Sequence, residues 1–145
     1  VAYIMLNMMQ ETVKSGSGAR LQWMYGLVDR EQEKNSIGAK TGTTQNASDG
    51  WFVSVTNELV TGAWVGGDDR AIHFSSWPDG QGARTALPIV GLFMQKVYAD
   101  STIGFEKTLF QRPNDLNMEI DCALFEQIAS PTDTTNTIIF DDDIF

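Results

Sequence analysis

The stretch KTGTT at residues 40–44, with the apolar run at 50–67 that follows it, decides the fold of this chain. KTGTT lies in a predicted strand, residues 37–44, that contains two glycines. Within a strand, glycine usually marks a place where another group approaches the backbone closely. The following run splits into two further strands, 51–56 and 59–67, rich in β-branched and aromatic residues. Parallel pairing would need longer crossovers than these short connections, so the pattern predicts an antiparallel meander of three strands.

The side chains of the second and third strands should follow the two-residue period of a β-strand. Trp51, Val53 and Val55 alternate and therefore share one face. We expect the large aromatics of this region, Trp51, Phe52 and Trp64, in the core or on the faces of the sheet.

Helices are predicted on both sides of the meander in the sequence. Ala2–Lys14 carries an apolar stripe at helical spacing, which is typical of a helix that packs one face on a core. Thr85–Asp100 is apolar nearly all round, so we expect it to be buried against the sheet, with Gly91 kept for close packing there. Arg20–Val28, with alternating aromatics, is expected to be extended. The apolar stripe of the predicted helix Ala2–Lys14 consists of Ile4, Met5, Met8, Met9 and Val13. The predicted fold class is α+β, with a three-stranded antiparallel meander flanked by helices.

Charge and composition divide the chain into a globular part and an acidic end. Residues 1–100 contain eight basic and ten acidic residues, whereas 101–145 contain two basic and nine acidic residues, out of a net charge of -9. We therefore predict one domain over 1–100, an irregular extension over 101–129 with one helical turn near Ala123–Gln127, and a polar, acidic, flexible tail over 130–145. No basic face is expected that could bind nucleic acid.

The cysteine and histidine content argues against metal chemistry. Cys122 and His73 are each the only residue of their type. A lone cysteine excludes an intramolecular disulfide and a thiolate cluster, so we expect no metal site and no cofactor. The apolar runs are too short to span a bilayer, and Val1 opens within a predicted helix. We therefore expect this sequence to be an excerpt of a longer protein.

The KTG motif and its surroundings resemble the transpeptidase domain of class A penicillin-binding proteins, the bifunctional cell-wall synthases. KTG at 40–42, DGWF at 49–52 and LVTGAWVG at 59–66 resemble the third to fifth strands of that domain, and ALPI at 86–89 resembles the start of a later helix. The resemblance covers roughly residues 2–100. It implies part of the fold shared by penicillin-binding proteins and serine β-lactamases, with further strands contributed by the start of the domain.

The resemblance also implies a set of site residues for acyl transfer from a peptide ending in D-alanyl-D-alanine. The backbone N–H of Thr43 would contribute to the oxyanion hole, and the hydroxyls of Thr41 and Thr43 would hold the terminal carboxylate. Lys40 and Gly42 alternate onto the opposite face, so Lys40 must reach round the strand edge toward the serines. The predicted catalytic residues are Lys40 and Thr43, and the predicted substrate-binding residues are Thr41, Gly42, Thr43, Thr44 and Gln45.

The chain departs from the family pattern in two respects. Ala39 stands where the family usually has glycine before the lysine. No serine here is followed by lysine three residues on or by asparagine two residues on, so the Ser-x-x-Lys and Ser-x-Asn motifs of the family are absent. The nucleophile and its base are therefore expected in an upstream part of the parent protein, and this chain alone should be inactive.

The function that follows for the parent is that of a peptidoglycan D,D-transpeptidase sensitive to β-lactams, at the periplasmic or outer face of the cytoplasmic membrane. Its expected partners are stem peptides, β-lactams and the remainder of the transpeptidase domain. A second copy of the chain could also pair through the open edge of the strand at 59–67. Two alternatives stay open: a related D,D-carboxypeptidase or β-lactamase, and a non-catalytic binding or assembly module on the same scaffold.

Overall fold

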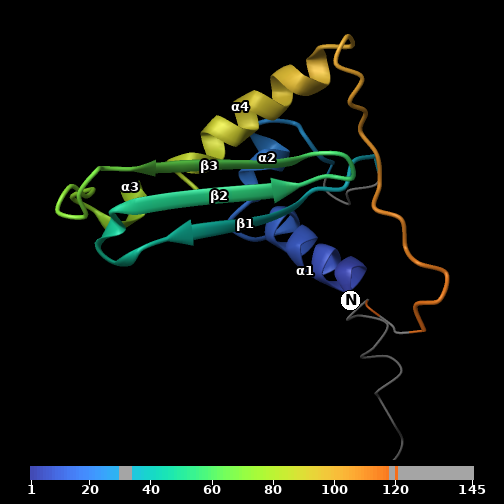
Figure 1. Ribbon diagram of the computed structural model, residues 1–145, viewed down its shortest axis with the longest axis horizontal. Coiled ribbons are helices and arrows are strands. Elements are labelled where there is room, and N and C mark those ends of the chain that lie inside the picture. Colours follow the sequence, from blue (N-terminus) through green and yellow to red (C-terminus); the bar gives the residue numbers. More distant parts are fainter. Residues whose placement is uncertain (30–33, 118–119, 121–145) are drawn as a thin grey trace, which may run out of the picture. The chain divides into compact units, whose positions relative to one another are not determined.

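A computed structural model describes residues 1–29, 34–117 and 120 of the chain. The chain divides into a first unit, Val1–Asn114, and a second unit, Asp115–Phe145. All the helices and strands of the described residues belong to the first unit (Figure 1). In chain order they are α1 (Ala2–Lys14), α2 (Arg20–Trp23), β1 (Gly38–Thr43), the 3-10 turn η1 (Gln45–Ala47), β2 (Asp49–Val55), β3 (Val60–Gly66), α3 (Trp77–Gly80) and α4 (Ala86–Ala99).

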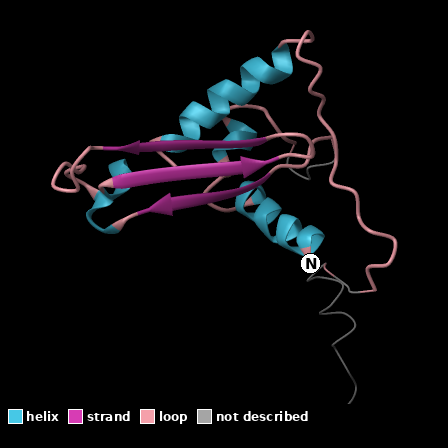
Figure 2. Cartoon of the chain, viewed as in Figure 1, coloured by secondary structure: helices cyan, strands magenta, loops and turns pink. Residues whose placement is uncertain are grey.

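The three strands form an antiparallel sheet in the order β1-β2-β3 (Figure 2). The register places Thr41 of β1 beside Phe52 of β2, and Phe52 beside Ala63 of β3. Both the meander and the α+β class are therefore confirmed. In the described part of the chain β1 and β3 are the two edges of the sheet.

Phe52 marks the face of the sheet that packs on the core. Its side chain is 0% exposed, while its neighbours Trp51 and Val53, which point to the opposite face, are 48% and 38% exposed. Residues from α1, α2 and α4 join Phe52 in one buried cluster. The cluster consists of Val13, Leu21, Leu27, Val28, Ile37, Ala39, Phe52, Ala86, Leu87, Val90 and Met94. The Phe52 face thus packs on the core, with Thr41, Thr43 and Ala63 half-buried on the two edge strands, and the face carrying Trp51 and Val53 is not covered in the described part.

The predicted aromatic positions are confirmed in the same way. Phe52 is a core residue, whereas Trp51 and Trp64 lie beside each other in the register of β2 and β3. Both tryptophans are about half exposed on the uncovered face. We call the exposed residues Lys40, Trp51, Val53, Val60 and Trp64 the outer face of the sheet.

The first helix has the predicted bounds, and the predicted stripe is confirmed in part. Val13 is buried and Ile4 and Met9 are half-buried, as predicted. The prediction was wrong for Met5 and Met8, which are exposed, because spacing alone does not show which side of a Met-rich helix meets the core. α1 packs against the start of β1, where a side chain on Gly38 would approach the Cβ atom of Met9 to 3.0 Å.

The segment after α1 was predicted to be extended and is instead helical at its start. α2 begins at Arg20, whose carbonyl accepts a hydrogen bond from the backbone N–H of Met24 at 3.0 Å. The prediction was wrong because the alternation of Trp23 and Tyr25 does not come from a strand: Tyr25 packs on α4.

The last helix, α4, is buried on one side only. Leu87, Val90 and Met94 are buried, but the equally apolar Leu92 and Phe93 are about half exposed. The prediction of a fully buried helix was therefore wrong, because nothing in the described part of the chain covers its second face.

Gly91 of α4 is required because the aromatic ring of Tyr25, and not the sheet, packs closely on it. A Cβ atom there would lie 2.8 Å from the aromatic ring of Tyr25. The expectation that Gly91 packs on the sheet was wrong in the partner, although close approach is indeed the reason for the glycine.

Several expectations lie outside the described residues. They concern the helical turn near 123–127, Cys122 and the tail at 130–145. Residues 101–114 contain no helix or strand, and the Thr108 carbonyl accepts a hydrogen bond from the Ser36 N–H at 2.9 Å. Among the described residues, no helix combines the length and apolarity that crossing a membrane requires.

Candidate functional site

The KTG motif occupies the edge strand β1, as the sequence predicts. Lys40 is exposed on the outer face, next to the buried Ala39, and its ammonium donates a hydrogen bond to the Thr41 carbonyl at 2.9 Å. Gly42 lies beside Trp51 in the register, and a Cβ atom on Gly42 would approach the Cβ atom of Trp51 to 3.1 Å. Glycine at this position therefore lets the indole lie close to the motif.

Thr41 and Thr43 turn their hydroxyls to the other face, the one that carries Phe52. The Thr41 hydroxyl is 2.9 Å from the Ser17 hydroxyl, in the turn after α1. The Thr43 hydroxyl accepts a hydrogen bond from the backbone N–H of Gly82 at 3.2 Å. Because a hydroxyl is both a donor and an acceptor, Thr43 still has its proton to donate, and Thr41 and Ser17 have one such proton between them. Both threonines are partly exposed and could donate to a carboxylate.

The turn after the motif is held by one carboxylate that the sequence did not single out. Thr44 donates to Asp49 at 2.9 Å, the Asp49 N–H donates back to the Thr44 hydroxyl at 2.9 Å, and Ser48 donates to the same carboxylate at 3.1 Å. The Trp64 indole N–H donates to its other oxygen at 3.1 Å. Hydrogen bonds from Thr44 first, and then from Trp64, hold the pKa of Asp49 below its ordinary value.

Asp49 therefore connects the end of the motif strand with the outer face of β3. The side chain of Thr44, a predicted substrate-binding residue, is engaged in this network. Gln45, the next predicted residue, is exposed in η1, and Asn46 beside it adopts a left-handed backbone with φ 64°. The sequence signal for the role of Asp49 was the short polar turn before Gly50 and Trp51, because an aspartate in such a turn commonly hydrogen-bonds to the backbone.

The loop before α4 approaches the motif strand from the core side. Gly82 lies so close that a Cβ atom would clash with the carbonyl oxygen of Trp51 and stand 2.6 Å from that of Gly42. Only a glycine permits this approach, and it brings the Gly82 N–H to Thr43. Sequence reasoning missed this contact, which joins residues far apart in the chain.

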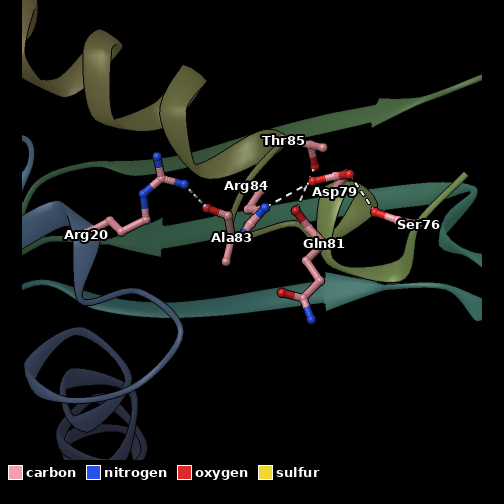
Figure 3. Close-up of polar contacts among 7 residues, drawn as sticks. All are labelled: Arg20, Ser76, Asp79, Gln81, Ala83, Arg84 and Thr85. Carbon is pink, nitrogen blue, oxygen red and sulfur yellow. Dashed lines mark hydrogen bonds and ion pairs between the residues drawn. The ribbon is translucent and has the colours of Figure 1, made fainter. Parts of the chain in front are cut away.

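A chain of polar contacts holds this loop in place (Figure 3). The Arg20 guanidinium donates to the Ala83 carbonyl at 2.9 Å, and the Ser76 hydroxyl donates to Asp79 at 2.5 Å. Arg84 forms an ion pair with Asp79 at 3.0 Å. The Ser76 hydrogen bond is the main cause that lowers the pKa of Asp79, and Arg84 adds to it. The loop is thus tied to α2 and presents Gly82 to the motif strand.

Metal ligands do not gather in the part of the chain that the structure describes. No group of three or more His, Cys, Asp or Glu side chains there could hold an ion. His73 is exposed, with its Nδ1 atom 3.0 Å from the Phe74 carbonyl oxygen. The chemistry that the described site can support is hydrogen bonding to a carboxylate and placement of a lysine ammonium.

Comparison with known proteins agrees with the resemblance over part of the chain. No family model matches it. It is 30% identical to penicillin-binding protein 1A of Pseudomonas aeruginosa over 125 residues, which are 83% of this chain and 13% of that protein. It is 37% identical to penicillin-binding protein 1B of Escherichia coli over 69 residues, which are 48% of this chain and 7% of that protein. The chain thus spans only a small fraction of the length of these relatives.

A solved structure gives the same result for the fold. The crystal structure of penicillin-binding protein 1A from Haemophilus influenzae matches with a TM-score of 0.50 and 28% identity, over 68% of this chain and 13% of that one. The three-stranded sheet and its flanking helices therefore correspond to part of that protein. The chain is similar, over a small part of their length, to the class A penicillin-binding proteins 1A and 1B.

Proposed function

We propose that this chain is the C-terminal part of the transpeptidase domain of a class A penicillin-binding protein, whose parent is a peptidoglycan D,D-transpeptidase and also a glycosyltransferase. The observation that carries the proposal is the geometry of β1. This edge strand presents two threonine hydroxyls on one face and a lysine ammonium on the other. Such an edge can bind an extended peptide along its backbone while its side chains hold the peptide terminus.

The proposed reaction assigns a role to each motif residue. A serine outside this chain attacks the carbonyl of the D-alanyl-D-alanine bond, its proton passes to a base, and the terminal D-alanine leaves. The backbone N–H of Thr43 stabilises the oxyanion, and the hydroxyls of Thr41 and Thr43 hold the terminal carboxylate. An amine of a second peptide then attacks the acyl-serine, which completes the crosslink and frees the serine. Gly42 gives the peptide backbone clearance, while Thr44 and Gln45 border the groove.

The exposure of Lys40 on the outer face of the sheet supports this proposal. Lys40 is exposed on the outer face, whereas the Phe52 face packs on the core, so a nucleophile can approach Lys40 over the outer face or at the edge of β1. Trp51, Val53 and Trp64 leave a contiguous apolar surface there, of the kind that marks an interaction site. We propose that the remainder of the transpeptidase domain covers this surface and brings its serines to the lysine.

The edge of β3 offers a second place for missing structure. An open groove of about 320 Å³ runs between this strand and the exposed side of α4, lined by Leu59, Val60, Ile89 and Phe93 among others. In the parent, a further strand of the domain would pair here. In the isolated chain, we expect a second copy to occupy the edge. Sedimentation at high concentration should show a dimer or larger species, and a monomer would rule this out.

We place the parent at the outer face of the cytoplasmic membrane, because peptidoglycan crosslinking takes place there. A β-lactam would acylate the same serine as the stem peptide. Neither carboxypeptidase nor β-lactamase activity is favoured by a feature of the described site.

The test is covalent labelling with a fluorescent penicillin. The isolated chain should stay unlabelled, because it lacks the nucleophile. A protein extended by the upstream coding sequence should be labelled, and Lys40→Ala in it should reduce the labelling rate by at least about tenfold, as expected when a general acid–base or electrostatic group is lost. Lys96→Gln, on the exposed side of α4, is the matched control and should label like the wild type. Labelling of the isolated chain, or none in the extended protein, would contradict the proposal.

A further inference from the structure

An open cavity of about 560 Å³ lies on the core side of the sheet, between α2 and the loop before α4. Figure 3 draws four of its lining residues, Arg20, Gln81, Ala83 and Arg84. No motif of the sequence points to it. Its lining residues are Arg20, Trp23, Met24, Gln81, Ala83 and Arg84.

The cavity is positively charged within an acidic chain. Arg20 donates to the Ala83 carbonyl at 2.9 Å and to the Met24 sulfur at 3.2 Å, and both of these partners are neutral. Among the described residues, no carboxylate forms an ion pair with Arg20, whereas Lys14 pairs with Glu11 and Arg84 pairs with Asp79. A guanidinium has five N–H donors in a planar fork, so Arg20 keeps donors for an anion.

Asp79 neutralises only part of this charge. Its lowered pKa keeps it ionised at neutral pH, so it balances one of the two guanidinium groups, that of Arg84. Both members of that pair are more than half exposed, and an exposed ion pair is weak and exchanges easily with another carboxylate. The cavity therefore has a net positive charge, although the whole chain carries -9.

The wall of the cavity is apolar beside the charge. Trp23, the last residue of α2, is 67% exposed, and Met24, the C-cap of α2, is 45% exposed. An exposed tryptophan next to arginines is suited to a ligand that has an apolar part adjoining its anionic group. A free inorganic anion would leave this wall unused, whereas an acidic peptide would cover it.

The cavity adjoins the threonines of the motif strand through two contacts. Gly82, between the lining residues Gln81 and Ala83, donates its N–H to Thr43. Ser17, three residues before Arg20, contacts the hydroxyl of Thr41. A peptide whose terminal carboxylate binds the two hydroxyls would thus have the cavity beside it.

We propose that this cavity binds a side-chain carboxylate of an acidic peptide whose terminal carboxylate lies on Thr41 and Thr43. This inference rests on the proposed function for the terminal carboxylate only, and it adds a second anchor that selects peptides with an upstream acidic residue. Arg20 and Arg84 bind the side-chain carboxylate, and Trp23 packs on the neighbouring apolar atoms of the peptide.

The experiment uses the full chain and three short N-acetylated peptides in calorimetric titrations. The first ends in D-alanyl-D-alanine and has a glutamate upstream, the second has glutamine in its place, and the third keeps the glutamate but has an amidated C-terminus. We expect the glutamine peptide to bind about tenfold more weakly than the first, since a charge-assisted contact to arginine is lost.

Two variants separate the cavity from a general effect of charge. Arg84→Gln, at an exposed side chain that should not affect folding, is expected to abolish the preference for glutamate over glutamine. Lys96→Gln removes the same charge from the exposed part of α4 and should leave the preference intact. Circular dichroism confirms that both variants are folded.

The outcomes separate this inference from the proposed function. Equal binding of the glutamate and glutamine peptides, or a preference that survives Arg84→Gln, overturns the cavity assignment. If amidation weakens binding but replacing glutamate with glutamine does not, Thr41 and Thr43 bind the terminal carboxylate and the cavity assignment is wrong. If amidation has no effect but the glutamate preference depends on Arg84, the cavity stands and the clamp on Thr41 and Thr43 falls. Binding of none of the peptides overturns the inference.

Discussion

Replacing Phe52 with alanine tests whether one face of the sheet carries the stability of this fold. Phe52 is 0% exposed and lies in the central strand, in the cluster that joins the strands to α1, α2 and α4. Removing a buried phenylalanine side chain costs about 3–5 kcal/mol, from lost transfer free energy and the cavity left behind. Domains of this size are stable by about 5–15 kcal/mol, so Phe52→Ala should remove a large part of the free energy of unfolding.

Val53→Ala is the matched control, one residue further along the same strand. Val53 is 38% exposed and points to the outer face. Removing two methyl groups from a partly exposed site with no further cover should cost less than about 1 kcal/mol. The two substitutions thus differ mainly in the face that they sample.

Urea unfolding followed by far-ultraviolet circular dichroism measures both changes, through the midpoint and the slope of the transition. The chain should be kept dilute, because association through the β3 edge would add a concentration-dependent stabilisation. If Val53→Ala costs as much as Phe52→Ala, the outer face is covered, and the expectation that the remainder of the domain binds there is wrong. A loss under about 1 kcal/mol for Phe52→Ala would refute the placement of the core.

Two further predictions concern the loop and the turn beside the motif. Gly82→Ala should push the loop off the motif strand and speed amide exchange at residue 82, since its Cβ atom would clash with strand carbonyls, whereas Gly62→Ala, with its nearest contact at 3.7 Å, should leave this exchange unchanged. Unchanged exchange in Gly82→Ala would contradict the contact with Thr43. Asp49, with a pKa held below its ordinary 3.8, should stabilise the fold above about that pH, and the stabilisation should disappear as the pH falls through the lowered pKa. Acid titration of the chain should therefore change the fluorescence of Trp64 and lower the unfolding midpoint. The Asp49→Asn variant should lack this part of the acid response. The same acid response in wild type and variant would exclude Asp49 as its source.

The strands were predictable because their signals are local. Alternation and turn residues define β2 and β3, and the short connections leave antiparallel pairing as the only geometry. The faces of the helices were not predictable in the same way. In α4 the exposed Phe93 and the buried Met94 are both apolar, and only the arrangement of the neighbouring elements decides which of them is covered.

In the candidate site too, the features set by local sequence were predictable and the contacts between distant segments were not. Strand alternation places Thr41 and Thr43 on one face, and the structure has them there. Their partners Ser17 and Gly82 come from distant parts of the chain, and no local pattern relates them to the motif. Asp49 lies between these cases, since its turn was visible in the sequence but its hydrogen bond to the indole of Trp64 on the neighbouring strand was not.

Under the proposed function, the position of Lys40 restricts how the active site of the parent can be assembled. Strand geometry puts its ammonium opposite the threonine hydroxyls, and on the threonine side the core and the Gly82 loop leave these hydroxyls only partly exposed. A serine nucleophile that must reach both the lysine and a peptide held by the threonines therefore has to stand at the free edge of β1, supported by a segment on the outer face. The exposed indole of Trp51, which Gly42 allows to lie beside the motif, is then part of the surface that receives this segment. If the proposed function holds, Gly42 has two roles: it would clear space for the peptide, and it lets the indole of Trp51 lie where the catalytic half of the domain would bind.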